Sequence, residues 1–207
     1  MSNPQKRRIG IMGGTFDPIH YGHLFIAECA RYKFSLESVL FIPAGDPAHK
    51  HRKDIVEAVH RFEMTRLAVH SNPFFFLSDL EVKRSGPTYT VDTLEYLHAE
   101  NGEDVELFFI TGADAIIEIL TWKNVTRVFE LCQFIAVTRP GYSFEKMNDV
   151  LNSLDPVFQR KIHIHETSGI MVSSTEIRQS VAKGEPIRYL LPEAVEKYIL
   201  AHALYLG

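Results

Sequence analysis

Cysteine is scarce in this chain of 207 residues, which contains only Cys29 and Cys132. Two cysteines inside apolar runs can build neither a disulfide framework nor a cysteine-based zinc site, so we expect a reducing compartment. Basic residues are not in excess either, because 22 Lys and Arg stand against 26 Asp and Glu, for a net charge of −4. This balance argues against a protein that binds nucleic acid by neutralising many phosphates, although a few local cations could hold a small anion.

Long apolar runs are also absent. A signal peptide needs about 7–15 apolar residues after its basic start and a membrane helix about 18–20, whereas Lys6-Arg7-Arg8 leads straight into a short apolar strand. We therefore expect a cytoplasmic protein that does not bind a membrane. Neither an internal repeat nor a low-complexity linker interrupts the chain, so residues 1–207 are expected to form a single domain.

Short β-type runs alternate with segments of helical spacing along the whole chain. The strand runs are nearly continuous in apolar residues, which is typical of parallel strands covered on both faces. The alternation predicts an α/β fold: a doubly wound parallel sheet with helices on both faces and closing C-terminal helices. Strands are expected over residues 9–12, 39–43, 74–78, 105–111, 133–138 and 161–165, and helices over 24–33, 55–70, 90–100, 113–120, 144–154, 175–183 and 193–204.

The loop after the first expected strand, which reads GGTFDPIHYGH, carries the densest chemistry. Gly13 and Gly14 remove two side chains at the strand tip, so backbone N–H groups can approach a ligand. His20 and His23 are three residues apart at a helix start and project to the same side, and Gly22 leaves room for a bulky group. The helix N-terminus adds exposed N–H groups and partial positive charge. Together these features predict a polyphosphate site.

A metal pair is the main alternative interpretation of the two histidines. No third His, Cys or carboxylate stands at an obvious ligand spacing, so zinc is disfavoured and no metal-ligating side chains are predicted. The loop matches neither a Walker A sequence nor GxGxxG, which argues against an ordinary P-loop NTPase or dehydrogenase. Because histidine titrates near neutrality and a polyphosphate favours its protonated form, activity is expected to depend on pH between roughly 6 and 8.

A second helix start lies near the C-terminus, in the segment VSSTEIR. Ser173, followed three residues later by Glu176, has the form of a capping box. Arg178 lies about one turn into the helix, where its guanidinium can reach an oxyanion beside the cap hydroxyls. Two helix starts with cations and hydroxyls, at opposite ends of an α/β chain, form a more specific pattern than either alone.

These two motifs together resemble those of the nucleotidylyltransferase superfamily, whose members carry a GxFDPxHxGH loop and an SSTxIR helix start. Further segments resemble bacterial nicotinate-nucleotide adenylyltransferases and occur in that family's order, so the resemblance extends over nearly the whole chain. One departure is Asp46-Pro47-Ala48, where family members often have a second proline. The matching segments are Ala48-His49-Lys50, RSGPTYTVDTL at 84–94, Gly112-Ala113-Asp114, Trp122-Lys123 and Thr138-Arg139-Pro140-Gly141.

The resemblance implies a Rossmann-like fold and one reaction. ATP and nicotinate mononucleotide, with Mg²⁺, give nicotinate adenine dinucleotide and pyrophosphate as a step towards NAD. The mononucleotide phosphate attacks the α-phosphorus of ATP in line, so catalysis is positioning and charge stabilisation without a covalent enzyme intermediate. The oligomeric state stays open, a homodimer included. The implied catalytic residues are His20, His23, His49 and Arg178, and the implied ATP contacts also include Gly13, Gly14, Thr15, Phe16, Lys50, Ser174 and Thr175.

The same resemblance assigns the second substrate. Trp122, the only tryptophan, is implied to stack on the pyridine ring. Backbone N–H groups near Thr88-Tyr89-Thr90 and Trp122 are implied to bind the carboxylate, since amide donors prefer a carboxylate to a carboxamide. Asp114 is a candidate contact for ribose or adenosine hydroxyls, or else a cap for the helix that follows.

Other functions remain open on the sequence. An adenylyltransferase acting on nicotinamide mononucleotide or phosphopantetheine is the nearest, although phosphopantetheine enzymes are usually shorter and have Thr in place of His20. Cytidylyl transfer also fits, because no residue distinguishes adenine from cytosine. A non-catalytic nucleotide sensor would be expected to have lost parts of the phosphate motifs, yet His20, His23 and Arg178 are all present.

Overall fold

The computed structural model describes residues 6–47, 55–138 and 141–206. The predicted ligand contacts of His49 and Lys50 lie outside these residues, as does the Arg139-Pro140 part of the resemblance. Within the described part of the chain, no helix is both long and apolar enough to cross a membrane.

Six strands form the central sheet, in the order β4-β2-β1-β6-β7-β8. Counted among themselves along the chain, they lie in the order 3-2-1-4-5-6 of the doubly wound Rossmann sheet. β6 pairs in parallel with β1 and β7, and β7 with β8. Each strand lies where the sequence predicted one, so the α/β fold class is confirmed. The strands are β1 (Arg7–Gly14), β2 (Ser38–Pro43), β4 (Phe75–Leu77), β6 (Val105–Gly112), β7 (Cys132–Thr138) and β8 (Ile162–Glu166).

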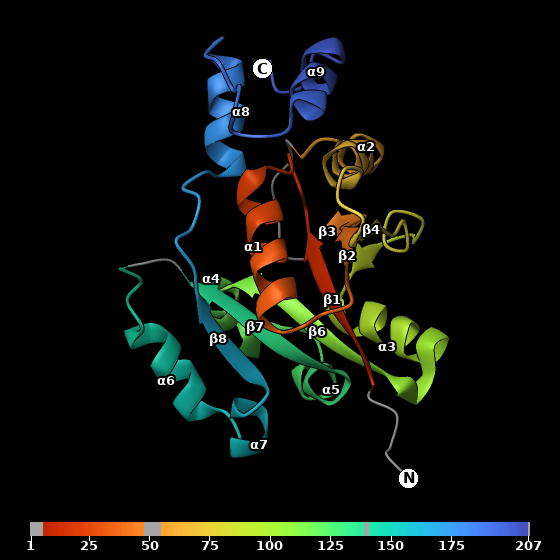
Figure 1. The fold of residues 1–207 in the computed structure, drawn as a ribbon, viewed down its shortest axis with the longest axis vertical. Helices are drawn as coiled ribbons and strands as arrows, with labels where there is room; N and C mark the ends of the chain where they lie inside the picture. The colour runs from red at the N-terminus through yellow and green to blue at the C-terminus, as the bar shows by residue number, and fades with distance from the viewer. Residues whose placement is uncertain (1–5, 48–54, 139–140, 207) are drawn as a thin grey trace. The chain divides into compact units, whose positions relative to one another are not determined.

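Helices alternate with these strands, as the colour order in Figure 1 shows. The chain divides into two compact units, and β1, α1 and β2 each pass from one unit to the other. The helices are α1 (Tyr21–Lys33), α2 (Ala58–Val69), α3 (Thr90–Asn101), α4 (Ala113–Ile117), α5 (Val125–Leu131), α6 (Glu145–Ser153), α7 (Pro156–Gln159), α8 (Ser174–Ala182) and α9 (Glu193–Ala201), and short 3₁₀ turns cover Gly102–Asp104 and Ile119–Thr121.

Unit 1 comprises residues 1–13, 26–40 and 89–169 and contains most of the sheet. The near-continuous apolar runs predicted a strand layer buried on both faces, and Phe108, Ile110 and Phe134 are indeed buried. Within this unit α3 packs against α5 and α4 against α6.

Unit 2 comprises residues 14–25, 41–88 and 170–207. Its helix α2 packs against α9 and against β4. A further two-residue parallel pair joins β3 (Asp46–Pro47) to β5 (Pro87–Thr88). Both phosphate motifs predicted from the sequence belong almost entirely to this unit.

The structure departs from the predicted helices by two additional helices and by several shifted ends, among them the start of α1 at Tyr21 instead of residue 24. Helices α5 and α7 are additional: α5 begins with two β-branched residues of low helix propensity, and α7 is one short turn. Asp155 caps α7 by accepting from the Val157 N–H at 2.7 Å, with Pro156 next to it, a local signal that could have identified this helix. The last helix ends at Ala201 instead of residue 204.

Candidate active site

The two histidines of the first motif lie side by side in unit 2. Their rings stack with centroids 3.8 Å apart and an interplanar angle of 26°. The Nδ1 atom of His23 accepts from the backbone N–H of His20 at 3.3 Å, which caps the start of α1. An Nδ1 that accepts leaves Nε2 to carry the proton of the neutral ring, so His23 has a donor suited to an anionic oxygen.

The turn that precedes these rings is built around Phe16. Its φ of 49° lies in the left-handed region, which L-residues other than Asn and Asp rarely adopt. Its buried ring packs edge-on to His23 with centroids 5.1 Å apart. A Cβ on Gly14 would lie 3.0 Å from the Phe16 ring, and one on Gly13 would lie 3.2 Å from Phe109. Both glycines therefore allow close packing at the strand tip.

Two expectations for the start of α1 are wrong. The sequence predicted exposed N–H groups there, but the N–H of Tyr21 donates to the Leu190 carbonyl at 3.1 Å and that of His23 to the His20 carbonyl at 3.0 Å. The space beside Gly22 is not left for a bulky group either, because a Cβ there would lie 3.0 Å from the His20 ring. Leu190, from a distant part of the chain, binds the first of these N–H groups, whereas the neighbouring His20 ring fills the space beside Gly22.

His20 is buried, and burial lowers its pKa to about 4 while Glu176 opposes the shift. Its Nδ1 has no hydrogen-bond partner among the described residues. The ring is therefore neutral across pH 6–8 in the free protein. His20 of the free protein is thus not the group behind the pH dependence expected between 6 and 8.

The second motif forms the predicted helix start. Ser173 caps α8: its Oγ accepts from the Glu176 N–H at 3.2 Å, and the Glu176 carboxylate accepts from the Ser173 N–H at 2.9 Å. The capping box is thereby confirmed. The first helical N–H groups, those of Ser174 and Thr175, lack intrahelical acceptors by position and are suited to an anion.

Two hydrogen bonds attach this helix start to the first motif, within unit 2, and a third lies within the helix. The Ser174 hydroxyl donates to the Pro18 carbonyl at 2.9 Å, across 156 residues of sequence. Arg178 donates from Nη1 to the Asp17 carbonyl at 2.6 Å and from Nη2 to the Thr175 hydroxyl at 3.1 Å. The structure thus brings the two predicted phosphate motifs together, with the Arg178 guanidinium between them.

Arg61 is a residue that the sequence interpretation missed. Although charged, its side chain is 1% exposed, and its guanidinium donates to four backbone carbonyls at 2.6–2.8 Å. One of these belongs to Thr15, whose carbonyl is therefore directed inward. The signal available was an arginine at helical spacing from Met64 and Ala68 on the apolar side of the expected helix. The other three carbonyls belong to Ala44, Gly45 and Val56.

The residues predicted to recognise nicotinate lie mostly in unit 1. Lys123 binds two of the matching segments together: its Nζ lies 4.2 Å from the centroid of the Tyr89 ring and 3.3 Å from the Asp92 carboxylate. Trp122 is half-buried and packs against Phe109 and Phe134, with centroids 5.6 and 6.0 Å away and large interplanar angles. Those contacts hold the indole in place. Its proposed stacking on the pyridine ring stays a prediction.

The remaining predicted contacts have different surroundings. Asp114 is exposed in the first turn of α4, and Gly112 occupies the N-cap position, so Asp114 is not the capping residue. Burial and, secondarily, Asp114 raise the pKa of Tyr142. In unit 2, the Thr88 hydroxyl donates to the Asp46 carbonyl at 3.0 Å. Thr90 begins α3, so its N–H is among those that lack an intrahelical acceptor.

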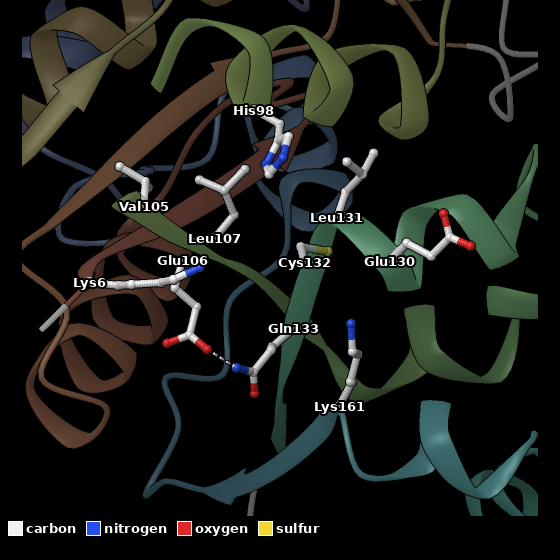
Figure 2. Close-up of a pocket in the computed structure, with 10 residues that line it drawn as sticks. All are labelled: Lys6, His98, Val105, Glu106, Leu107, Glu130, Leu131, Cys132, Gln133 and Lys161. Atoms are coloured by element: carbon white, nitrogen blue, oxygen red, sulfur yellow. Dashed lines mark hydrogen bonds between the residues drawn. The ribbon is translucent and has the colours of Figure 1, made fainter. Parts of the chain in front are cut away.

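A cavity of about 340 Å³ lies in unit 1 at the amino-terminal ends of β6 and β7 (Figure 2). It contains none of the predicted site residues. The Lys161 ammonium in its wall donates to the Phe129 carbonyl, and the Glu106 carboxylate accepts from the Gln133 amide. Burial raises the pKa of the Cys132 thiol to about 12, so it is not a thiolate near neutrality. The lining residues are Lys6, His98, Val105, Glu106, Leu107, Glu130, Leu131, Cys132, Gln133 and Lys161.

Known proteins resemble this chain over nearly its whole length. The Cytidylyltransferase-like family model matches residues 11–180. A protein of Moorella thermoacetica named "Probable nicotinate-nucleotide adenylyltransferase" is 50% identical over 198 residues, covering 96% of this chain and 91% of that protein. A protein of the same name from a Thermoanaerobacter species is 48% identical over 201 residues, covering 97% and 95%.

A solved structure has the same fold. It is Plasmodium falciparum nicotinic acid mononucleotide adenylyltransferase complexed with NaAD, which superposes with a TM-score of 0.75 at 22% sequence identity and covers 96% of this chain and 97% of that one. The family model and the relatives that are 48–50% identical over nearly the whole chain establish the family. The chain belongs to the cytidylyltransferase-like family and, within it, to the nicotinate-nucleotide adenylyltransferases.

Proposed function

We propose that this chain transfers the adenylyl group of ATP to nicotinate mononucleotide, releasing pyrophosphate and forming nicotinate adenine dinucleotide. The observation that carries the proposal is the joining of two motifs 156 residues apart, which sets His23 and Arg178 around one turn. Relatives that share about half of this sequence are named for the same activity. Residues 1–207 act as one domain in this proposal, because the matched family segment includes residues of both units.

The reaction needs no protein nucleophile. An oxygen of the mononucleotide phosphate forms a bond to the α-phosphorus of ATP while the bond from that phosphorus to the β-phosphate oxygen breaks, and pyrophosphate leaves with the electron pair. His23 donates from Nε2 to an α-phosphoryl oxygen, where charge develops, and His20 contributes to the same phosphate site. Arg178 and the N–H groups of Ser174 and Thr175 hold the β and γ phosphates, which leave.

Magnesium accompanies ATP in this proposal. Among the described residues, no three His, Cys, Asp or Glu side chains lie close enough to hold a metal ion. The donor set at the motifs consists of imidazoles, a guanidinium and N–H groups, which suit phosphate oxygens and not Mg²⁺. In this proposal the ion would be held by phosphate oxygens and water, and it would neutralise phosphate charge.

Nicotinate is selected by the segment around Trp122. The indole stacks on the pyridine ring, and the N–H of Thr90 donates to its carboxylate, because the N–H of Trp122 already donates to the Ile119 carbonyl at 3.1 Å. A carboxamide that turned its NH₂ group to this donor would leave it unpaired, which typically costs about 1–3 kcal/mol. Preference for the acid over the amide is thus the expected specificity.

Release of pyrophosphate tests the whole proposal. Purified protein is given Mg²⁺-ATP with nicotinate mononucleotide, nicotinamide mononucleotide or phosphopantetheine, and CTP replaces ATP in a parallel series. Turnover confined to ATP with nicotinate mononucleotide is expected. A preference for another acceptor would overturn the assignments at Trp122 and Thr90, a preference for CTP would overturn the nucleotide, and no turnover by folded protein would favour a nucleotide sensor.

A further inference from the structure

Asp17 lies in the middle of the first phosphate motif, yet its side chain is only 3% exposed. A buried carboxylate needs hydrogen-bond donors or cations, because removal from water is otherwise very unfavourable. The hydroxyl of Tyr205 donates to its Oδ1 at 2.9 Å, from 188 residues away in the sequence. Arg178 lies 3.7 Å from Oδ2. The carboxylate is thus turned toward the protein and not presented to a ligand.

The end of α9 directs Tyr205 to this carboxylate. After the helix, the N–H of Leu204 donates to the Ile199 carbonyl at 3.0 Å and that of Ala203 to Leu200 at 3.2 Å, the two bonds of a Schellman turn. Ala203 occupies the left-handed position, with φ 49°, where glycine is usual, and Tyr205 itself has φ 66°. Such conformations cost on the order of 1–3 kcal/mol and persist where the surroundings compensate for them.

The helix that carries this turn is itself anchored within unit 2. Val195 and Ile199 of α9 are fully buried, and α9 packs against α2. The same helix α2 supplies Arg61, which binds the Thr15 carbonyl. The turn that begins the phosphate motif is therefore held at Thr15 by α2 and at Asp17 by the segment after α9.

Asp17 is bonded to groups that are proposed to contact ATP. Its backbone carbonyl accepts the 2.6 Å hydrogen bond from Arg178, and the next carbonyl, of Pro18, accepts from Ser174. Rotation or displacement of Asp17 would therefore move the guanidinium and the start of α8. Displacement of a reacting arrangement by about 1 Å can lower turnover on the order of 100-fold.

We propose that Tyr205 is a positioning residue for adenylyl transfer: its hydroxyl holds the Asp17 carboxylate, and through Asp17 it fixes Arg178 and the turn leading to His20. The inference rests on the proposed function. Burial and the neighbouring carboxylate raise the pKa of Tyr205, so the phenol keeps the proton that it donates. In this proposal Tyr205 acts through Asp17, and its effect is on the geometry of the site.

Tyr205→Phe removes the hydroxyl alone, and Tyr198→Phe is the matched control, since it deletes a hydroxyl that binds His60 in the same C-terminal segment. We expect Tyr205→Phe to lower kcat about 10- to 100-fold with the KM for nicotinate mononucleotide within about 3-fold of the parent. Tyr198→Phe should keep parental kcat even if both variants melt at similarly lower temperatures. Parental kcat in Tyr205→Phe, or an equal loss in the control, would overturn the proposal.

Asp17→Ala closes a double-mutant cycle. If Tyr205 acts through this carboxylate, adding Tyr205→Phe to Asp17→Ala should change kcat less than about 2-fold, and full additivity would contradict the inference. Should Tyr205→Phe be unfolded at the assay temperature, the parent and all variants are assayed at a lower temperature at which it is folded, and reduced or parental turnover decides in the same way. The parent protein is included in every assay. An inactive parent would contradict the proposed function, whereas an active parent with equally active variants would contradict only the role of Tyr205.

Discussion

The phosphate motifs and the nicotinate segment are held in place by different kinds of contact. In the phosphate motifs, side chains deep in unit 2 bind backbone carbonyls: Arg61 is 1% exposed, and the Arg178 side chain is 14% exposed. In the nicotinate segment, the link between Tyr89, Asp92 and the Trp122 loop is Lys123, whose side chain is 49% exposed. The first region relies on buried hydrogen bonds, whereas the second relies on a solvated cation and on the packing of Trp122 against Phe109 and Phe134.

This difference affects how well ordered each region is in the free protein. An exposed ion pair contributes about 0–1 kcal/mol, whereas removing one partner from a buried hydrogen-bonded charge costs several times as much. We therefore infer that the phosphate site is largely preorganised in the free protein. The exposed ion pair of the proposed nicotinate segment contributes less to the order of that segment.

The largest expected effect comes from breaking the buried support of the phosphate motifs. Arg61→Met leaves four carbonyls without their donor, and we expect the free energy of unfolding to fall by about 3–5 kcal/mol. Arg66→Met, on the same helix, removes a half-exposed guanidinium paired with Glu63 and should cost about 0.5 kcal/mol or less. Urea unfolding of both measures the difference, and equal losses would show that burial of Arg61 is unimportant.

Removal of the proposed phosphate donor comes next. His23→Ala should lower kcat/KM by about 10²–10³, or roughly 2.7–4 kcal/mol, with the fold retained. His70→Ala, at an exposed position after α2, is the control and should match the parent. Steady-state assays of pyrophosphate release decide the matter, and near-parental turnover in His23→Ala would reject its central role.

The buried state of His20 makes a prediction about acid stability. Its pKa is about 4 in the folded protein and about 6.5 when unfolded, so between these pH values only the unfolded chain binds the proton. This proton stabilises the unfolded chain, so the free energy of unfolding falls by up to about 3 kcal/mol as the pH falls from about 6.5 to 4. Above about pH 6.5 neither state binds the proton, and His20 has no such effect. Unfolding of the parent and of His20→Asn at pH 7, 5.5 and 4 should differ by this pH dependence, and parallel curves would contradict it.

The smallest expected effect is in the nicotinate segment. Trp122→Ala should raise the KM for nicotinate mononucleotide about 10-fold, whereas Trp122→Phe keeps a stacking face and should change it less. The KM for ATP serves as the internal control and should stay near the parental value. Titration with nicotinate mononucleotide should also quench the fluorescence of the single tryptophan, and an unchanged signal at saturation would argue against stacking.

Features that a short local residue pattern indicates were predicted correctly, whereas features that depend on the packing of the folded chain were not. The capping box at Ser173 and Glu176 and the six apolar strands are confirmed, because a residue pattern a few positions long is enough to indicate each of them. The proposed exposed N–H groups at Tyr21 and the open space at Gly22 are wrong, because Leu190 and the His20 ring occupy those positions. The predicted ligand contacts at His23, Arg178 and Trp122 stay predictions.

By itself, the sequence determined the strand order along the chain, the two phosphate motifs and the likeness to a family of adenylyltransferases, since periodicity, capping and motif spacing are local properties. Only the tertiary structure decided that Arg61 is buried against four carbonyls, that Arg178 binds the Asp17 carbonyl and that Tyr205 reaches the Asp17 carboxylate. The physical reason is that a charged or hydroxylated side chain has no intrinsic preference for a partner 161 or 188 residues away. Burial removes water, and the nearest carbonyl or carboxylate then becomes the required partner.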